Sequence, residues 1–251
     1  MKFRFKAFGL HLLASSVALS SILGALYFGW YRWPGWYLTG VTEVVTVMVG
    51  VDIVLGPLLT LIVARSDKPR RVLARDIAVI VAAQLCALVY GTVSLWNGRP
   101  LYYAYSVNIL QLVQAYDIEG AESALGQKQN PGLAPHWYSL PRWIWAPLPQ
   151  DKDTAVKIVT SAVTGGDDVT SMPRYFKPWD QGLSVLRTQL KKVDEVPYFA
   201  HKDKNTLKAR MAAAGVAADQ PNCMPLTGRG RPLLAVFDPA SVKIVAIFKA
   251  R

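Results

Sequence analysis

The chain has 251 residues, of which 52% are hydrophobic and only 18% are charged. This composition is too apolar for an ordinary soluble domain and, together with long apolar runs, is typical of a membrane protein. The formal net charge of +11 would suit a nucleic-acid-binding protein, but residues 97–251 carry nineteen basic against thirteen acidic side chains with no dense basic patch. We therefore do not expect a nucleic-acid partner.

The first apolar run covers residues 7–28 and follows three basic residues. Ala18 and Ser20 form a small-residue pair of the kind found at signal-peptide cleavage sites, so a signal peptide is one interpretation. The apolar stretch continues well beyond this pair, and we therefore predict an uncleaved transmembrane helix. The ring-rich residues 30–37 that follow are typical of a membrane–water interface, which we favour over an aromatic ligand-binding box.

The second apolar run, residues 37–63, carries Asp52 near its centre. Aspartate there costs about 3 kcal/mol on insertion, which the many Leu, Ile and Val residues, at about 0.3–0.6 kcal/mol each, outweigh. An ionisable residue at this depth is a functional hypothesis by default. Pro57 has no N–H and leaves the carbonyl of Ile53 without its helical donor, so another partner is needed in lipid. Gly56, one turn after Asp52, offers a flat site for another backbone.

A third apolar run, residues 77–96, completes the predicted membrane region. Five Lys and Arg residues lie between the second and third runs, in residues 65–75, whereas only Arg32 lies between the first two. This asymmetry follows the positive-inside rule and predicts that the N-terminus and the loop of residues 65–75 are cytoplasmic. The basic loop itself suits contact with anionic headgroups of the lipid bilayer.

The third run contains Gln84 and Tyr90 as candidate partners for the second run. Counting depth back from the shared loop places Tyr90 near the level of Asp52, so we predict a hydrogen bond between these two side chains. Gln84 lies nearer the cytoplasmic side and is expected to pair with backbone groups freed around Pro57. Two roles for Asp52 stay open: it holds the chain's own helices together, or it contacts a partner.

Residues 97–251 read as one soluble α+β domain after the membrane region of residues 1–96. We expect paired strands at residues 101–107 and 109–115, and a short helix capped by Asp117. Asp151 and Gly165 are expected to start and stop a helix over residues 151–163. The remaining predicted elements are a short strand at 143–147, helices at 180–192 and 205–214, and a hairpin of strands 232–237 and 242–248.

Signatures of enzyme chemistry are absent from the sequence: we find no nucleophile elbow, phosphate-binding loop or dinucleotide fingerprint. The three histidines lie in different segments, and Cys86 and Cys223 fall one in an apolar run and one in the soluble part, so neither a metal site nor a disulfide is expected. Glu43 lies nine residues before Asp52, which places the two carboxylates on opposite faces of one helix. We predict no catalytic residue, cofactor or metal.

Several short motifs occur together in this order along the chain. They are the run VDIVLGPLLTLIV at 51–63 with its basic loop, Arg75-Asp76, Gln84-Leu85, Tyr90-Gly91, Gly98-Arg99-Pro100, residues 146–149 and 173–178, and the hairpin at Asp238. This layout resembles the type IV pilin accessory proteins of the TfpX/TfpZ kind, which include FimB-like proteins. The hairpin turn departs from that pattern, because it reads Asp-Pro-Ala-Ser where a glycine is expected.

The resemblance implies a multi-pass protein of the bacterial inner membrane with a periplasmic C-terminal domain. Its expected role is to support type IV pilin stability, assembly or pilus dynamics through contacts with pilin and the assembly machinery, without a known catalytic residue. We hypothesise that the face formed by Asp52, Gly56 and Pro57 docks the apolar helix of a pilin. The sequence leaves open which pilin is served and whether the chain forms a homo-oligomer.

Two other classes of function stay open at this stage. One is an enzyme that modifies pilin by glycosyl or acyl transfer, for which Glu43, Asp167 and Asp168 would be the candidate acids. For Asp167 and Asp168 we favour another interpretation, in which a glycine ends the preceding helix and the two acids after it are solvated. The other class is a transporter, which three helices suit only if the chain oligomerises.

Overall fold

The computed structural model describes residues 2–65 and 68–250; Ser66 and Asp67 of the predicted basic loop lie outside this range. The chain divides into two compact units. A membrane unit comprises Met1–Arg32 and Gly40–Gly98, and a soluble unit comprises Trp33–Thr39 and Arg99–Arg251. Three long apolar helices are thus followed by a domain of helices and strands, as the sequence predicts.

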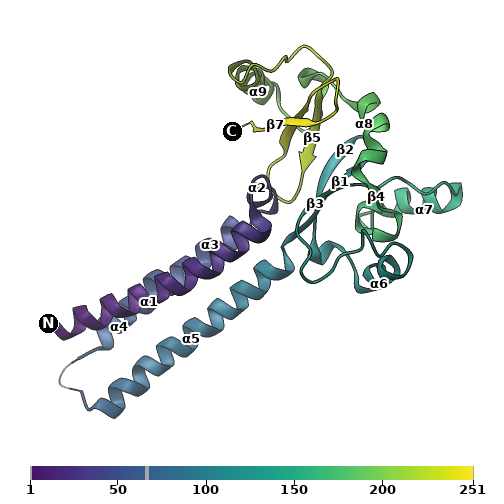
Figure 1. The fold of residues 1–251 in the computed structure, drawn as a ribbon. Helices are drawn as coiled ribbons and strands as arrows, with labels where there is room; N and C mark the ends of the chain where they lie inside the picture. Colours follow the sequence, from purple (N-terminus) through teal and green to yellow (C-terminus); the bar gives the residue numbers. More distant parts are fainter. Residues whose placement is uncertain (1, 66–67, 251) are drawn as a thin grey trace. The chain divides into compact units, whose positions relative to one another are not determined.

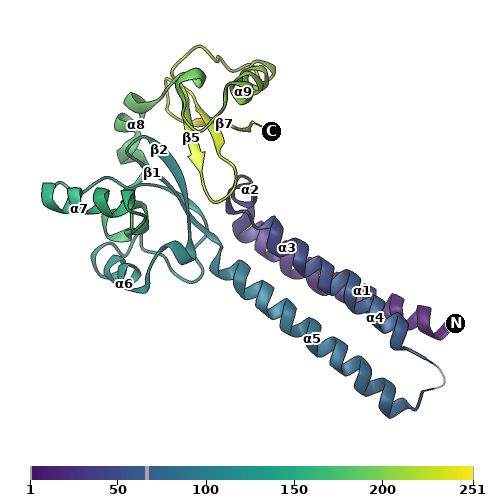
Figure 2. The ribbon, with the colours of Figure 1, turned by 180° about the vertical axis from the view of Figure 1, so that it is seen from behind.

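The membrane unit contains three helical spans that run side by side (Figures 1 and 2). The first combines α1 (Lys2–Leu26) with a π-helical end, η1 (Tyr27–Tyr31). The second is built from α3 (Thr42–Val49), the π-helix η2 (Gly50–Leu55) and α4 (Gly56–Val63), and the third is α5 (Arg70–Asn97). The N-terminal end of α1, the end of α4 and the start of α5 lie together at one end of this unit (Figure 1).

One face of α5 packs against the other spans. Its buried residues are Gln84, Gly91 and Leu95, which recur at seven- and four-residue spacing as expected for one helix face. Gly91 lies directly under the Met48 side chain, and the Tyr31 hydroxyl donates a hydrogen bond of 2.7 Å to the Leu95 carbonyl. The rest of α5 is mostly exposed within this chain, which is the arrangement of a lipid-facing helix.

The connection between the first two spans belongs to the soluble unit, not to the membrane unit. It forms the short helix α2 (Gly35–Thr39), whose Leu38 side chain is 0% exposed. The Gly230 backbone N–H donates to the Leu38 carbonyl at 2.7 Å, and a Cβ at Gly228 would lie 2.6 Å from the same oxygen. The predicted second span, residues 37–63, therefore begins later, at Thr42, because residues 37–39 are used in the soluble core.

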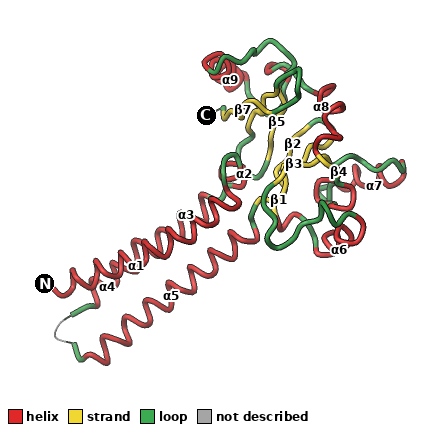
Figure 3. The backbone as a smooth tube through the Cα atoms, in the orientation of Figure 1, coloured by secondary structure: helices red, strands yellow, loops and turns green. Residues whose placement is uncertain are grey.

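The soluble unit is built on one mixed sheet of seven strands in the order β4-β3-β1-β2-β5-β6-β7 (Figure 3). The predicted hairpins are both present: β1 pairs antiparallel with β2, and β6 with β7. Parallel pairs join β1 to β3 and β2 to β5. The strands are β1 (Pro100–Ser106), β2 (Ile109–Gln114), β3 (Arg142–Trp145), β4 (Lys177–Pro178), β5 (Cys223–Thr227), β6 (Leu233–Phe237) and β7 (Ile244–Lys249).

Strand β1 is buried along its whole length because the sheet is covered on both faces. Tyr103 and Tyr105 point into the core cluster that also holds Leu38, whereas Tyr102 and Ala104 point into a second cluster on the opposite face, as strand alternation requires. The helices that complete these layers are α6 (Gly120–Gln129), α7 (Lys152–Val163), α8 (Leu183–Gln189) and α9 (His201–Ala213).

The predicted helix boundaries agree best with the structure where a capping residue next to the helix marks its end. Asp151 caps α7 by accepting the Thr154 backbone N–H at 2.9 Å, and Gly165 follows the helix with a positive φ of 86°. The prediction that Asp117 starts a helix was wrong: its carboxylate accepts the Gln114 N–H at 2.7 Å and closes a 3₁₀ turn, so α6 begins three residues later. α9 begins earlier than residue 205, and α8 is shorter than predicted.

Candidate functional site

The second span departs from α-helical hydrogen bonding in the π-helix η2, just before Pro57. In η2 the Gly56 N–H donates to the Val51 carbonyl, five residues back, instead of to the Asp52 carbonyl as in an α-helix. In this shifted register the Asp52 carbonyl would need the N–H of residue 57, and proline has none. One carbonyl in the middle of a membrane span is therefore left without a backbone donor.

Gln84 of α5 supplies the missing donor. Its side-chain Nε2 donates to the Asp52 carbonyl at 3.2 Å, and its side chain is only 7% exposed. We predicted that Gln84 pairs with backbone freed around Pro57, and the structure brings them together, although the carbonyl is that of Asp52 and not that of Ile53. The bond joins the second and third spans at a π-helical segment, a feature often found at functional sites.

Gly56 provides the space for this bond. A Cβ on Gly56 would overlap the Gln84 amide group, so the glycine is covered by the chain's own α5. Pro57 is buried as well. The flat surface that we expected Gly56 to offer to a partner is thus occupied by Gln84 in the structure.

The Asp52 carboxylate is 4% exposed and lies beside this bond. Among the described residues, neither Asp52 Oδ2 nor Gln84 Oε1 has a hydrogen-bond donor. Both side chains line a cavity of about 190 Å³ in the membrane unit. Two buried acceptor oxygens thus belong to residues that line one small cavity, and buried acceptors of this kind cost free energy until a donor reaches them.

The hydrogen bond that we predicted between Tyr90 and Asp52 is not formed, because the Tyr90 side chain is 77% exposed. The depth estimate ignored rotation around the helix. Gln84 and Gly91 are seven residues apart and share the packed face of α5, while Tyr90 is turned about 100° away from Gly91. Tyr90 therefore belongs to the outer face of the span.

His11 is a member of this site that sequence reasoning missed. Its Nδ1 lies 2.6 Å from the Thr60 hydroxyl of α4, and its ring lines the same cavity as Asp52. The pair joins the first and second spans, just as Gln84 joins the second and third. A histidine inside a long apolar run was the available signal, but nothing local connected it with Thr60.

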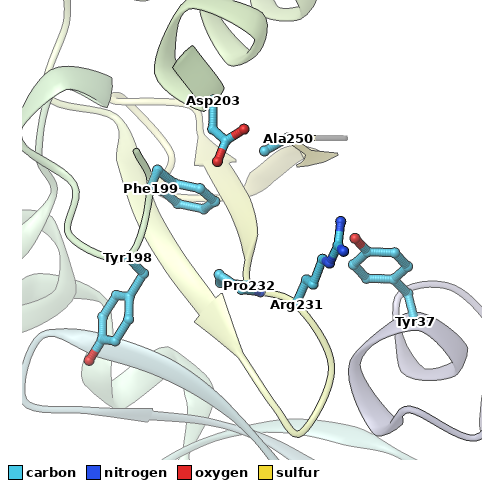
Figure 4. Close-up of a pocket in the computed structure, with 7 residues that line it drawn as sticks. All are labelled: Tyr37, Tyr198, Phe199, Asp203, Arg231, Pro232 and Ala250. Atoms are coloured by element: carbon cyan, nitrogen blue, oxygen red, sulfur yellow. The ribbon is translucent and has the colours of Figure 1, made fainter. Parts of the chain in front are cut away.

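The soluble unit has a second cavity, of about 180 Å³, lined by residues from α2, α9 and the chain between β5 and β6 (Figure 4). The Arg231 guanidinium lies beside the Tyr37 hydroxyl, while Phe199 and Asp203 line another side of the cavity. This volume is below the roughly 300 Å³ of typical small-molecule sites. The lining contains both a cation and a carboxylate, so it does not select one sign of charge.

A third cavity, of about 490 Å³, is acidic. Asp167 and Asp168 line it together with Asp117 and Glu119, but two of these acids are already used: Asp168 accepts the Val169 N–H at 2.7 Å, and Asp117 closes the turn described above. Burial is the main cause that raises the pKa of Asp117 above its ordinary value. Within the described ranges, no group of three His, Cys, Asp or Glu residues is arranged to hold a metal ion.

Three curated proteins of Dichelobacter nodosus are similar to this chain: the fimbrial assembly proteins of serogroup E1, of serogroups C1 and C2, and of serogroup I. Each is 28% identical over 116 residues, which is 46% of this chain. The match spans 45% of the serogroup E1 and I proteins, about half their length, and 88% of the protein of serogroups C1 and C2. No protein-family model and no solved structure matches the chain.

Proposed function

We propose that this chain is an inner-membrane accessory protein that supports the assembly of type IV pili through contacts with pilin. The observation that carries the proposal is the similarity to three proteins named for fimbrial assembly. The membrane unit supports it further, since its spans line a largely apolar cavity, with Asp52 and Gln84 among its lining residues, that suits the binding of another membrane protein. The enzyme and transporter alternatives gain no comparable support.

The proposed orientation puts the N-terminus in the cytoplasm and the soluble unit in the periplasm. The basic residues before α1 and between α4 and α5 favour this orientation by the positive-inside rule. A second argument comes from the fold: residues 33–39 and 99–250 form one unit, so they must lie on the same side of the membrane. An even number of spans, two, separates them along the chain, which is consistent with that requirement.

A non-catalytic role is part of the proposal. The candidate acids of the enzyme alternative are divided between units: Asp167 and Asp168 belong to the soluble unit, and Glu43 is an exposed residue in the first turn of α3. Asp168 is engaged as a cap. An acyl or glycosyl transferase needs convergent acids or an activated nucleophile, and these residues do not form such a group.

Deletion of the gene in its piliated host tests the proposal. We expect fewer surface pili by electron microscopy, restored by the intact chain, while the mass of the pilin stays unchanged. A pilin whose mass shifts by a glycan or acyl group in the deletion strain would instead support the modifying enzyme. Normal pilus number and normal pilin level would refute a role in pilus assembly.

A further inference from the structure

The cavity at Asp52 forms a groove between α1 and α5. The residues that α1 contributes to the lining recur at helical spacing on one face of that helix, and so do those of α5. Asp52 of the second span completes the lining. The lining residues are His11, Ala14, Ser15, Ala18 and Leu19 on α1, and Val81, Gln84, Leu85 and Leu88 on α5. Each wall therefore runs along about two helical turns, or roughly 10 Å.

The walls of this groove are open within the chain. Ala14 and Ala18 on one side and Val81 and Leu85 on the other are exposed, and so would face lipid if nothing else covered them. Ala14 and Ala18 are four residues apart with Ser15 beside them, a pattern of small side chains that lets a second helix backbone approach closely. The shape thus suits a transmembrane helix that lies along the groove.

The chemistry at the bottom of the groove limits which helix fits. Asp52 Oδ2 and Gln84 Oε1 are acceptors without donors among the described residues, and their side chains are 4% and 7% exposed. Asp52 lies near the middle of the span Thr42–Val63, where bulk water does not supply donors. A binding helix therefore gains most if it carries an N–H or O–H donor at this depth.

We propose that the α1–α5 groove binds one transmembrane helix of another protein, apolar except for a hydrogen-bond donor that reaches Asp52 and Gln84. The identity of this partner rests on the proposed function: it is the pilin awaiting assembly. The surface differs from the Asp52–Gly56–Pro57 face suggested by sequence, because Gly56 is covered by Gln84 and the open walls belong to α1 and α5. The donor pairs with oxygens that the free protein leaves unpaired, so binding is favoured by polar as well as apolar contacts.

Photo-crosslinking in living cells tests this proposal. A photoreactive amino acid is placed in the groove at Ala18 or Leu85, and as matched controls at Val17 and Val79, exposed positions of the same helices outside the groove lining. We expect crosslinks to pilin from the two groove positions and not from the two controls. Equal crosslinking from all four positions, crosslinks only to a second copy of this chain, or none to pilin would overturn the proposal.

Two variants separate the shape of the groove from its chemistry. Ala18→Phe fills the groove at an exposed position and should abolish the Leu85 crosslink, while Val17→Phe should not. Asp52→Leu removes an unpaired buried acceptor, so it should leave the chain folded but lower the Leu85 crosslink about threefold to thirtyfold, the range for one interhelical hydrogen bond. An unchanged crosslink in Asp52→Leu, with normal protein level, would refute the donor requirement.

These outcomes are independent of the test of function. Fewer pili in the deletion strain without groove crosslinks to pilin would leave the assembly role standing and remove the groove as its site. Normal pili in that strain, together with groove-specific crosslinks to pilin that Asp52→Leu weakens, would keep the groove and refute the assembly role.

Discussion

Replacing Leu38 with alanine tests whether the connection between the first two spans is part of the soluble core. The Leu38 side chain is 0% exposed and belongs to the cluster that contains Tyr103, Leu226 and Leu233. Truncating a buried leucine loses its transfer free energy and leaves a cavity, at a cost of about 2–5 kcal/mol. Because α2 has only five residues and can shift to fill part of the cavity, we expect the lower half of this range.

Calorimetry of the full chain in detergent measures the effect. For a domain of this size, each kcal/mol lowers Tm by about 2–4 °C. A loss of about 2–3.5 kcal/mol should therefore lower the Tm of the soluble unit by roughly 4–14 °C. Leu140→Ala is the matched control, because Leu140 is 59% exposed in the same unit and should change stability by less than about 0.5 kcal/mol.

The comparison of the two leucines gives a clear outcome. If Leu38→Ala shifts Tm no more than Leu140→Ala does, α2 is not packed in the sheet core and the soluble domain begins after α5. A large shift for both would mean that the assay reports general weakening and not the burial of Leu38.

Three further predictions concern single groups. Gly56→Ala should force the Gln84 amide away and lower the stability of the membrane unit by about 0.6–2 kcal/mol through the lost interhelical hydrogen bond. Thermal shift in detergent measures this loss. The control is Gly50→Ala, whose Cβ would meet nothing within 4 Å and which should have no such cost. Cys223 is buried, and burial raises the pKa of its thiol to about 12. The thiol should therefore resist iodoacetamide at pH 8, where roughly one thiol in ten thousand is ionised. Rapid alkylation of Cys223, detected by mass spectrometry, would contradict this. Hydrogen bonds from Thr154 lower the pKa of Asp151 below its ordinary 3.8, so its cap should stabilise α7 above that pH and fade as pH falls through the folded pKa; Asp151→Ala should remove this part of the acid dependence in hydrogen-exchange measurements.

Sequence reasoning predicted the three spans because length and apolar content determine them almost alone. It also connected Gln84 with Pro57, since a proline in a membrane helix frees a carbonyl that must find a partner. It failed for Tyr90, because depth along a helix was considered without rotation around it. The His11–Thr60 contact was beyond reach for another reason: it joins residues from different spans, and neither residue carries a local sign of the other.

In the soluble unit, sequence reasoning missed α2, β5 and the two-residue strand β4. α2 is too short to show periodicity, and its position depends on contacts of Leu38 and Gly230 that are distant in sequence. Strand β5 was missed because Pro225 lies inside it, which normally argues against an interior strand. The structure tolerates this proline because β2 pairs with β5 only through the residues after it, Leu226 and Thr227.

The place of α2 in the soluble unit has a consequence for how the chain is made. Leu38 is synthesised before the second and third spans, whereas its partners Leu226 and Leu233 are synthesised only after them. The core can close only after the second and third spans have been inserted and the C-terminal segment has reached the same side of the membrane as residues 33–39. A chain inserted with the wrong topology would leave Leu38 and the cluster around Leu233 on opposite sides, unable to fold and exposed to proteases. Completion of the soluble core thus requires correct membrane insertion.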